Sequence, residues 1–152
     1  MNIAIIGAGS YKWGPLNIRD IILTQCLSQS KITLYDIDAE ALELVFQYSK
    51  MIETQAPYGI KIFKTSHLEH ALDGKDIIIL SISVGGLNAM EQDLQLAEKY
   101  GYFYPVGDTV GIPGFSRGLR HTKTIIKLGH LMEKYCPQAY LINTTNPIYI
   151  IT

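Results

Sequence analysis

The sequence has almost no net charge, no pattern typical of a secretory signal at its start and no long hydrophobic run. Its 13 Lys and Arg residues nearly balance 14 Asp and Glu residues, so the chain has no basic field with which to grip a nucleic acid backbone. No apolar run approaches the roughly 20 residues that span a bilayer, and Met1 leads directly into an apolar segment. We therefore expect neither a nucleic acid nor a membrane as a partner, and we expect a cytoplasmic protein.

The residue types that usually hold metals are also scarce. Cys26 and Cys136 are the two cysteines, both in segments with a helical pattern, and in a reducing compartment such thiols are usually small buried residues with no disulfide. No carboxylate or cysteine completes a metal set around the histidines, which are His67, His70, His121 and His130. We assign the histidines to surface or packing roles and assign no metal ligand.

What the chain does contain is a regular alternation of short β-branched runs with longer helical stretches. This alternation in 152 residues predicts one α/β domain, a parallel sheet with helices on both faces. The expected strands are Ile3–Ile6, Ile32–Tyr35, Ile60–Phe63, Ile77–Ser81 and Tyr140–Asn143. The expected helices are Leu16–Leu27, Ala39–Thr54 with Asp38 as its cap, Leu87–Tyr100 and Gly118–Tyr135.

The first expected strand is followed by the turn Gly7-Ala8-Gly9-Ser10. The first glycine permits a tight turn, and the second lets the backbone approach a pyrophosphate at the start of the next helix. Lys12 stands where the G-x-G-x-x-G pattern has its third glycine. Asp36 ends the second strand, where a carboxylate accepts hydrogen bonds from ribose hydroxyls and repels a 2′-phosphate. The pattern predicts a Rossmann-type site for NAD; the alternative is an ordinary turn with Asp36 or Asp38 only capping a helix.

Two other segments follow strands that end at the same edge of the expected sheet. Ser81 and Ile82 end the fourth strand, where a flat backbone can face the nicotinamide half of the cofactor. Asn146 follows the fifth strand, and Pro147 disfavours a helical conformation for it. Its amide can hydrogen-bond a substrate hydroxyl; the alternative is a turn residue that bonds its own backbone.

Arg117 and Arg120 lie where a loop rich in glycine enters the last long expected helix. A helix N-terminus disfavours cations, and a spacing of three places both side chains on one face. An anionic ligand would explain the pair, whereas the alternative is a solvated face or an interface.

Eight short motifs follow one another along the chain in an order more specific than any one of them. They are GAGS, LYDID, SISVGG, KYG, GDTVG, GLR, CPQAYLIN and TNP. Together they resemble the N-terminal domain of glycoside hydrolase family 4. The resemblance implies a fold like that of lactate and malate dehydrogenases, with NAD and a divalent metal, usually manganese, as cofactors. It also implies glycoside hydrolysis by hydride transfer from sugar C3 and elimination at C1, with the metal stabilising an enediolate.

The resemblance also implies roles for individual residues. Asn146 matches the family's substrate-binding asparagine. The positions that match its cofactor loop, ribose carboxylate and nicotinamide-side strand end are Gly7, Gly9, Ser10, Asp36, Ser81 and Ile82. The family's metal-binding cysteine and histidine and its tyrosine base come from sequence beyond TNP. We therefore expect no catalytic residue here, an N-terminal piece that is inactive alone, and a homo-oligomer, as the family implies.

The substrate expectation rests on the segment after Val84-Gly85-Gly86. Branches of the family that act on 6-phosphorylated sugars have an arginine there, whereas this chain has Met90. A methionine cannot make the bidentate hydrogen bonds with which an arginine binds phosphate. The GDTVG motif resembles that of the α-galacturonidase and α-galactosidase branch. We expect an unphosphorylated α-galacturonide or α-galactoside, with Arg117 or Arg120 facing the galacturonide carboxylate.

Two alternatives remain open. A lactate- or malate-type dehydrogenase shares the expected fold and an asparagine-proline corner, although GDTVG with GLR has no place in it. A non-catalytic NAD-binding module is favoured by the short length of the chain.

Overall fold

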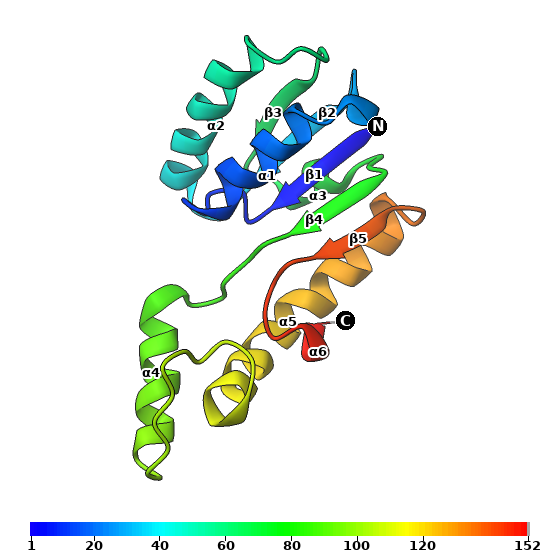
Figure 1. Cartoon of the computed structure of the whole chain (residues 1–152). Coiled ribbons are helices and arrows are strands. Elements are labelled where there is room, and N and C mark those ends of the chain that lie inside the picture. Colours follow the sequence, from blue (N-terminus) through cyan, green and yellow to red (C-terminus); the bar gives the residue numbers. More distant parts are fainter. Residues whose placement is uncertain (152) are drawn as a thin grey trace. The chain divides into compact units, whose positions relative to one another are not determined.

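The computed structural model describes residues 1–151, and their contacts form two compact units. Unit 1 contains Met1–Ile82 and Leu131–Ile142. Unit 2 contains Ser83–His130 and the described residues from Asn143 onward. Figure 1 shows the elements of both units.

Unit 1 is built on a parallel sheet with the strand order β3-β2-β1-β4-β5 (Figure 1). The strands are β1 Asn2–Ile6, β2 Lys31–Tyr35, β3 Lys61–Thr65, β4 Ile77–Leu80 and β5 Tyr140–Asn143. In the register of the central strands, Ile5 pairs with Leu34 of β2 and with Ile79 of β4. The order in which β1 lies between β2 and β4 is that of a Rossmann-type fold, which confirms the predicted class.

The central strands β1, β2 and β4 of unit 1 are largely buried because they carry large apolar side chains on both faces, whereas the side chains of β5 are mostly exposed. The large strand side chains that are fully buried are Ile3, Ile5, Ile32, Leu34, Ile62, Ile78 and Leu80. In Figure 1, α1 (Trp13–Ile22) and α2 (Ala39–Glu53) lie in front of the sheet and α3 (Leu68–Leu72) lies behind it. Helices therefore cover both faces, as the sequence predicts.

Two features of unit 1 differ from the sequence expectation. The helix expected over Leu16–Leu27 begins at Trp13 and ends at Ile22, and a separate 3₁₀ turn covers Gln25–Leu27. The Thr24 hydroxyl donates to the Asp20 carbonyl over 2.6 Å, a side-chain bond that competes with continued helix. The second difference is α3. We expected the strands Ile60–Phe63 and Ile77–Ser81 to follow one another with no helix between them.

Both cysteines are free thiols, but they differ in their surroundings. Cys136 is buried, as expected, and burial raises the pKa of its thiol. Cys26 is exposed in the 3₁₀ turn, so the expectation of a buried thiol is wrong there.

Unit 2 contains α4 (Gly86–Glu98), most of α5 (Gly111–Tyr135) and α6 (Ile148–Ile151). The expectation that α5 begins at Gly118 is wrong, because the helix begins at Gly111 and Gly114 serves close packing within its first turns. A Cβ atom at Gly114 would lie 2.4 Å from the carbonyl carbon of Thr109. Although α5 has 25 residues, neither it nor another helix within residues 1–151 is apolar enough over a sufficient length to cross a membrane.

Candidate functional site

The turn after β1 is shaped by a glycine that no other residue can replace without strain. Gly7 has a φ of 88°, and a Cβ atom there would lie 2.0 Å from the carbonyl oxygen of Ser81. The amides of Gly7 and Ala8 both donate to the carbonyl of Tyr35, over 2.9 and 3.0 Å. The turn is thereby fixed between the ends of β2 and β4, at the carboxyl edge of the sheet, where Rossmann-type folds open their ligand crevice.

The second glycine of the turn holds the acidic residue at the end of β2. The Gly9 amide donates to Asp36 Oδ2 over 2.8 Å, and the Asp38 amide donates to Asp36 Oδ1 over 3.0 Å. A Cβ atom at Gly9 would lie 2.9 Å from Asp36 Cγ. Asp38 caps α2 by accepting from the amides of Glu40 and Ala41. The helix cap is therefore Asp38, while Asp36 faces the glycine turn.

The start of α1 leaves backbone donors available. The Ser10 hydroxyl accepts from the Trp13 amide over 3.2 Å, and the Ser10 amide donates to the Gly7 carbonyl over 3.3 Å. The amides of Tyr11 and Lys12 donate to no acceptor within the described part of the chain. Free amides at the start of a helix favour an anion.

Ser81 and Ile82 lie beside the same turn, as the sequence predicts for the end of the fourth strand. The Ser81 amide donates to the Ile6 carbonyl over 2.8 Å and continues the ladder between β4 and β1. Both residues border Gly7, since a Cβ atom there would meet the Ser81 carbonyl and, at 2.9 Å, the Ile82 Cγ2 methyl.

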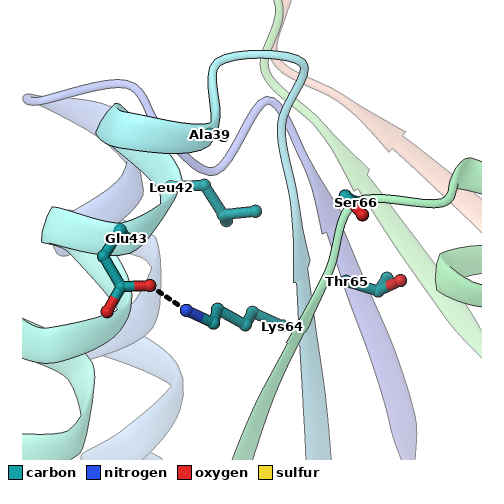
Figure 2. Close-up of a pocket in the computed structure, with 6 residues that line it drawn as sticks. All are labelled: Ala39, Leu42, Glu43, Lys64, Thr65 and Ser66. Carbon is teal, nitrogen blue, oxygen red and sulfur yellow. Dashed lines mark hydrogen bonds and ion pairs between the residues drawn. The ribbon is translucent and has the colours of Figure 1, made fainter.

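A pocket of about 390 Å³ lies in unit 1 between α2 and the end of β3 (Figure 2). It is lined by Ala39, Leu42, Glu43, Lys64, Thr65 and Ser66. The Lys64 ammonium is paired with the Glu43 carboxylate across this pocket. The pocket lies on the β3 side of β2, whereas the glycine turn lies on the β1 side of β2.

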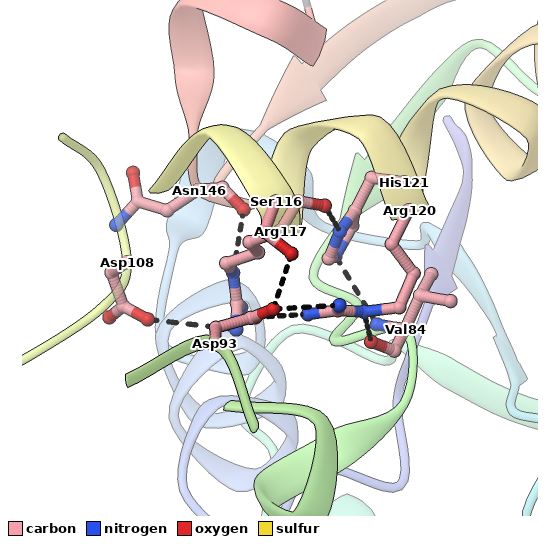
Figure 3. A network of polar contacts seen from close by, with 8 residues as sticks. All are labelled: Val84, Asp93, Asp108, Ser116, Arg117, Arg120, His121 and Asn146. Carbon is pink, nitrogen blue, oxygen red and sulfur yellow. Dashed lines mark hydrogen bonds and ion pairs between the residues drawn. The ribbon is translucent and has the colours of Figure 1, made fainter. Parts of the chain in front are cut away.

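Unit 2 contains a polar cluster centred on the buried carboxylate of Asp93 in α4 (Figure 3). The Ser116 hydroxyl donates to Oδ1 over 2.6 Å, and Arg120 donates from Nη1 to Oδ1 over 3.1 Å and from Nη2 to Oδ2. Burial alone would raise the pKa of Asp93, but the hydrogen bonds from Arg120 and Ser116 outweigh it and hold the pKa below its ordinary value.

The segment that follows β4 is bonded to α5 through both backbone groups of Val84. Its carbonyl accepts from Arg120 Nε over 2.9 Å, and its amide donates to His121 Nε2 over 3.2 Å. Because Nε2 accepts, the imidazole proton lies on Nδ1, which is 2.7 Å from the Arg117 carbonyl and donates to it. The fully buried His121 is therefore a neutral packing residue with both ring nitrogens bonded.

Arg117 connects the GDTVG motif with the TNP motif. Its Nε donates to the backbone carbonyl of Asn146 over 3.1 Å, and its Nη1 lies 3.6 Å from Asp108 Oδ1. Figure 3 shows the carboxamide of Asn146 directed away from this guanidinium. The arginine thus bonds the backbone of Asn146 and not its carboxamide.

These contacts change the argument made for the two arginines. Since α5 begins at Gly111, Arg117 and Arg120 lie well inside the helix, and the premise that they stand at its N-terminus is wrong. Each also has an acidic partner within unit 2, Asp108 and Asp93 respectively. Sequence reasoning missed Asp93, although it lies on the buried stripe of α4 between small apolar residues, where a carboxylate needs a partner.

Metal-ligating side chains do not gather in the part of the chain that the structure describes. Within residues 1–151, no three His, Cys, Asp or Glu side chains lie together as a set of metal ligands. The rings of His67 and His70 are 5.1 Å apart, at the start of α3.

The parallel sheet, its strand order and the glycine turn with an acidic residue after β2 define the class as a Rossmann-type α/β protein. The chain belongs to the family of family 4 glycosyl hydrolases, whose model it matches over residues 2–152.

Curated relatives of the chain carry the name alpha-galacturonidase. The chain is 37% identical to the alpha-galacturonidase of Thermoanaerobacter italicus, over 97% of this chain and 32% of that protein. It is 35% identical to the alpha-galacturonidase of Bacillus subtilis, over 100% of this chain and 33% of that protein. The chain therefore spans about a third of the length of these relatives.

Solved structures show the same fold. The 6-phospho-beta glucosidase of Thermotoga maritima, with manganese, NAD+ and glucose-6-phosphate, has a TM-score of 0.84 and 28% identity over 97% of this chain and 34% of its own. A 6-phospho-alpha-glucosidase from gut microorganisms, in complex with NAD and Mn2+, has a TM-score of 0.85 and 25% identity over 99% of this chain and 34% of its own. The lactate dehydrogenase of Eimeria maxima, at 18% identity and a TM-score of 0.64 over 99% of this chain and 37% of its own, shares the fold alone.

Proposed function

We propose that the chain binds NAD, with the pyrophosphate at the turn Gly7-Ala8-Gly9-Ser10 and the adenosine ribose at Asp36. The observation that carries this proposal is the placement of the Asp36 carboxylate, which the amides of Gly9 and Asp38 hold beside the turn. Each of its oxygens accepts one amide and keeps lone pairs for the ribose hydroxyls.

The geometry of the turn fits a dinucleotide. Side chains are excluded at Gly7 and Gly9 by the neighbouring backbone and carboxylate, so a phosphate can approach the main chain there. The amides of Tyr11 and Lys12 supply donors without partners in the described residues. Ser81 and Ile82, which border Gly7, are our candidates for the nicotinamide side. NAD held in this way supplies a hydride acceptor, while the residues of this chain bind and orient it.

Titration calorimetry with NAD and with NADP tests the cofactor assignment. The Asp36 carboxylate repels a 2′-phosphate, so we expect NAD to bind about tenfold or more tighter than NADP. Failure of NAD to bind, or tighter binding of NADP, would overturn the assignment.

We further propose that this cofactor site serves a glycosidase that acts on an unphosphorylated α-galacturonide or α-galactoside. Identity supports this choice, since four relatives named alpha-galacturonidase are 34 to 37% identical to the chain, whereas two named for phosphorylated glucosides are 28 and 29% identical. Met90 stands in α4 where the resemblance places an arginine for a sugar phosphate. Asn146 is our candidate for the contact with a sugar hydroxyl.

Of the two arginines expected to face the galacturonide carboxylate, Arg117 is the stronger candidate. Its Nη1 is 3.6 Å from Asp108, longer than a hydrogen bond, so its outer nitrogens keep donors for a carboxylate. The guanidinium of Arg120, in contrast, already makes three hydrogen bonds, two of them to Asp93.

A panel of glycosides tests the substrate; it is assayed with a full-length protein that contains this chain, with NAD and Mn2+ supplied. We expect cleavage of the α-galacturonide or the α-galactoside and none of the 6-phosphoglycosides; cleavage of only the latter would overturn the proposal. A divalent metal held by residues beyond TNP, a homo-oligomer and a cytoplasmic location belong to the same proposal. So does the expectation that residues 1–152 alone hydrolyse none of these glycosides.

A further inference from the structure

The third glycine of the dinucleotide pattern is present, two positions later than the pattern places it. A Cβ atom at Gly14 would lie 2.1 Å from the carbonyl oxygen of Ala8 and 3.4 Å from Val45 Cγ1. Gly14 is buried in the first turn of α1 and permits the close approach of α1 to the Ala8 backbone of the turn and to Val45 of α2, a packing role like that of the third glycine in G-x-G-x-x-G. The turn therefore has the form G-x-G-x-x-x-x-G, running from Gly7 to Gly14.

This shift frees position 12 to carry a side chain, and the residue there is a lysine. Lys12 is exposed, and it is the N-cap residue of α1 with an ordinary helical φ of −95°. The first turn of α1 contains no acidic residue, and within residues 1–151 no carboxylate lies within ion-pair distance of the Lys12 ammonium. Its Nζ lies 5.1 Å from the centroid of the Trp13 ring.

A cation in this position is unfavourable unless an anion is present. The partial positive charge at the start of a helix repels a lysine and attracts an anion. Arg117 and Arg120 are not subject to this repulsion, because they lie inside α5 and have acidic partners. Lys12 is subject to it, because it stands at the start of a ten-residue helix beside the unused amides of the turn.

We propose that Lys12 makes a charge contact with the pyrophosphate of the dinucleotide and so sets the affinity of this site. The inference rests on the proposed NAD site. The lysine adds a point charge to the backbone amides of the turn, and Trp13 keeps the ammonium at the start of α1 by a cation–π contact.

The experiment compares Lys12→Gln with the control Lys31→Gln in the 152-residue chain. Both changes remove one positive charge, but Lys31 begins β2 at the opposite, amino edge of the sheet. Titration calorimetry uses NAD, ADP-ribose and adenosine as probes. Fluorescence of Trp13, the single tryptophan, reports binding at the turn.

We expect Lys12→Gln to weaken NAD and ADP-ribose by about three- to tenfold and to leave adenosine, which has no phosphate, unchanged. Lys31→Gln should bind all three ligands as the unmodified chain does, and Lys12→Arg should retain the affinity. Equal NAD affinity in Lys12→Gln and the unmodified chain would overturn the inference and leave the NAD site standing. Equal weakening of adenosine would overturn it too. Absence of NAD binding by the unmodified chain would overturn the proposed function and the inference together.

Discussion

Asp36 and Asp38 stand two positions apart after β2, and their hydrogen bonds separate a ligand contact from a helix cap. Asp38 accepts from two amides of the first turn of α2, whereas Asp36 bonds the amides of Gly9 and of Asp38 itself. The sequence alone leaves both carboxylates as candidates for either role, because an aspartate at either position can cap the helix that follows. The assignment depends on Gly9, which is 27 positions away from Asp36.

The two aspartates can therefore be tested as a matched pair. Asp38→Ala should lower the free energy of unfolding by about 1 kcal/mol through loss of the cap and leave NAD affinity unchanged. Asp36→Ala should weaken NAD by about tenfold through loss of the ribose contact. Denaturant unfolding and titration calorimetry measure both effects. Equal loss of NAD affinity in the two variants would contradict the separate roles.

We predict that the contribution of Asp93 to the free energy of unfolding depends on pH. Its pKa in the folded chain is lowered, so its contribution is present above the ordinary pKa of about 4 and is lost as pH falls through the folded value. Asp93→Asn leaves the Arg120 guanidinium without its charged partner and should cost about 2 to 4 kcal/mol at pH 7. Urea unfolding at pH 7 and at pH 3 measures the free energy of unfolding of the unmodified chain and of Asp93→Asn. The two values should converge at the lower pH. A difference that stays constant would contradict the account.

At the scale of elements, the packing of α1 depends on Gly14. A Cβ atom there would meet backbone, the Ala8 carbonyl oxygen at 2.1 Å, which cannot move aside as a flexible side chain can. Gly14→Ala should therefore lower the free energy of unfolding by about 1 to 3 kcal/mol.

Gly129 in α5 supplies the control for this substitution. A Cβ atom there would meet nothing within 4 Å, so Gly129→Ala should raise the free energy of unfolding by about 0.5 to 1 kcal/mol because alanine favours helix. Thermal and urea unfolding of both variants measure the effects. A Gly14→Ala chain as stable as the Gly129→Ala chain would show that α1 does not pack as described.

The elements that the sequence predicted well are those with local signals. Asp38 marks the start of α2 because a cap is a contact between near neighbours, and the β-branched runs locate the strands to within a few residues. The start of α5 was missed because Gly114 and its neighbours resemble a loop, whereas they serve close packing that only the folded chain shows. The five residues of α3 are too few to display a helical period.

At the scale of the whole molecule, the candidate residues divide between the two units. The glycine turn, Asp36, Ser81 and Ile82 belong to unit 1, and Asn146 belongs to unit 2 with both arginines. The order of motifs was enough to identify the family, but it did not show which charges pair. Asp93 and Arg120 are 27 positions apart, and nothing local in the sequence indicates that they meet.

The central claim is that NAD binds at the glycine turn of unit 1. An NMR titration of the ¹⁵N-labelled chain with NAD tests it most directly, because each backbone amide reports its own surroundings. The account predicts saturable shifts in the amides of Gly9 to Lys12 and of Ile37, which follows Asp36. Shifts confined to the pocket residues Lys64 to Ser66, or no saturable shift, would contradict it.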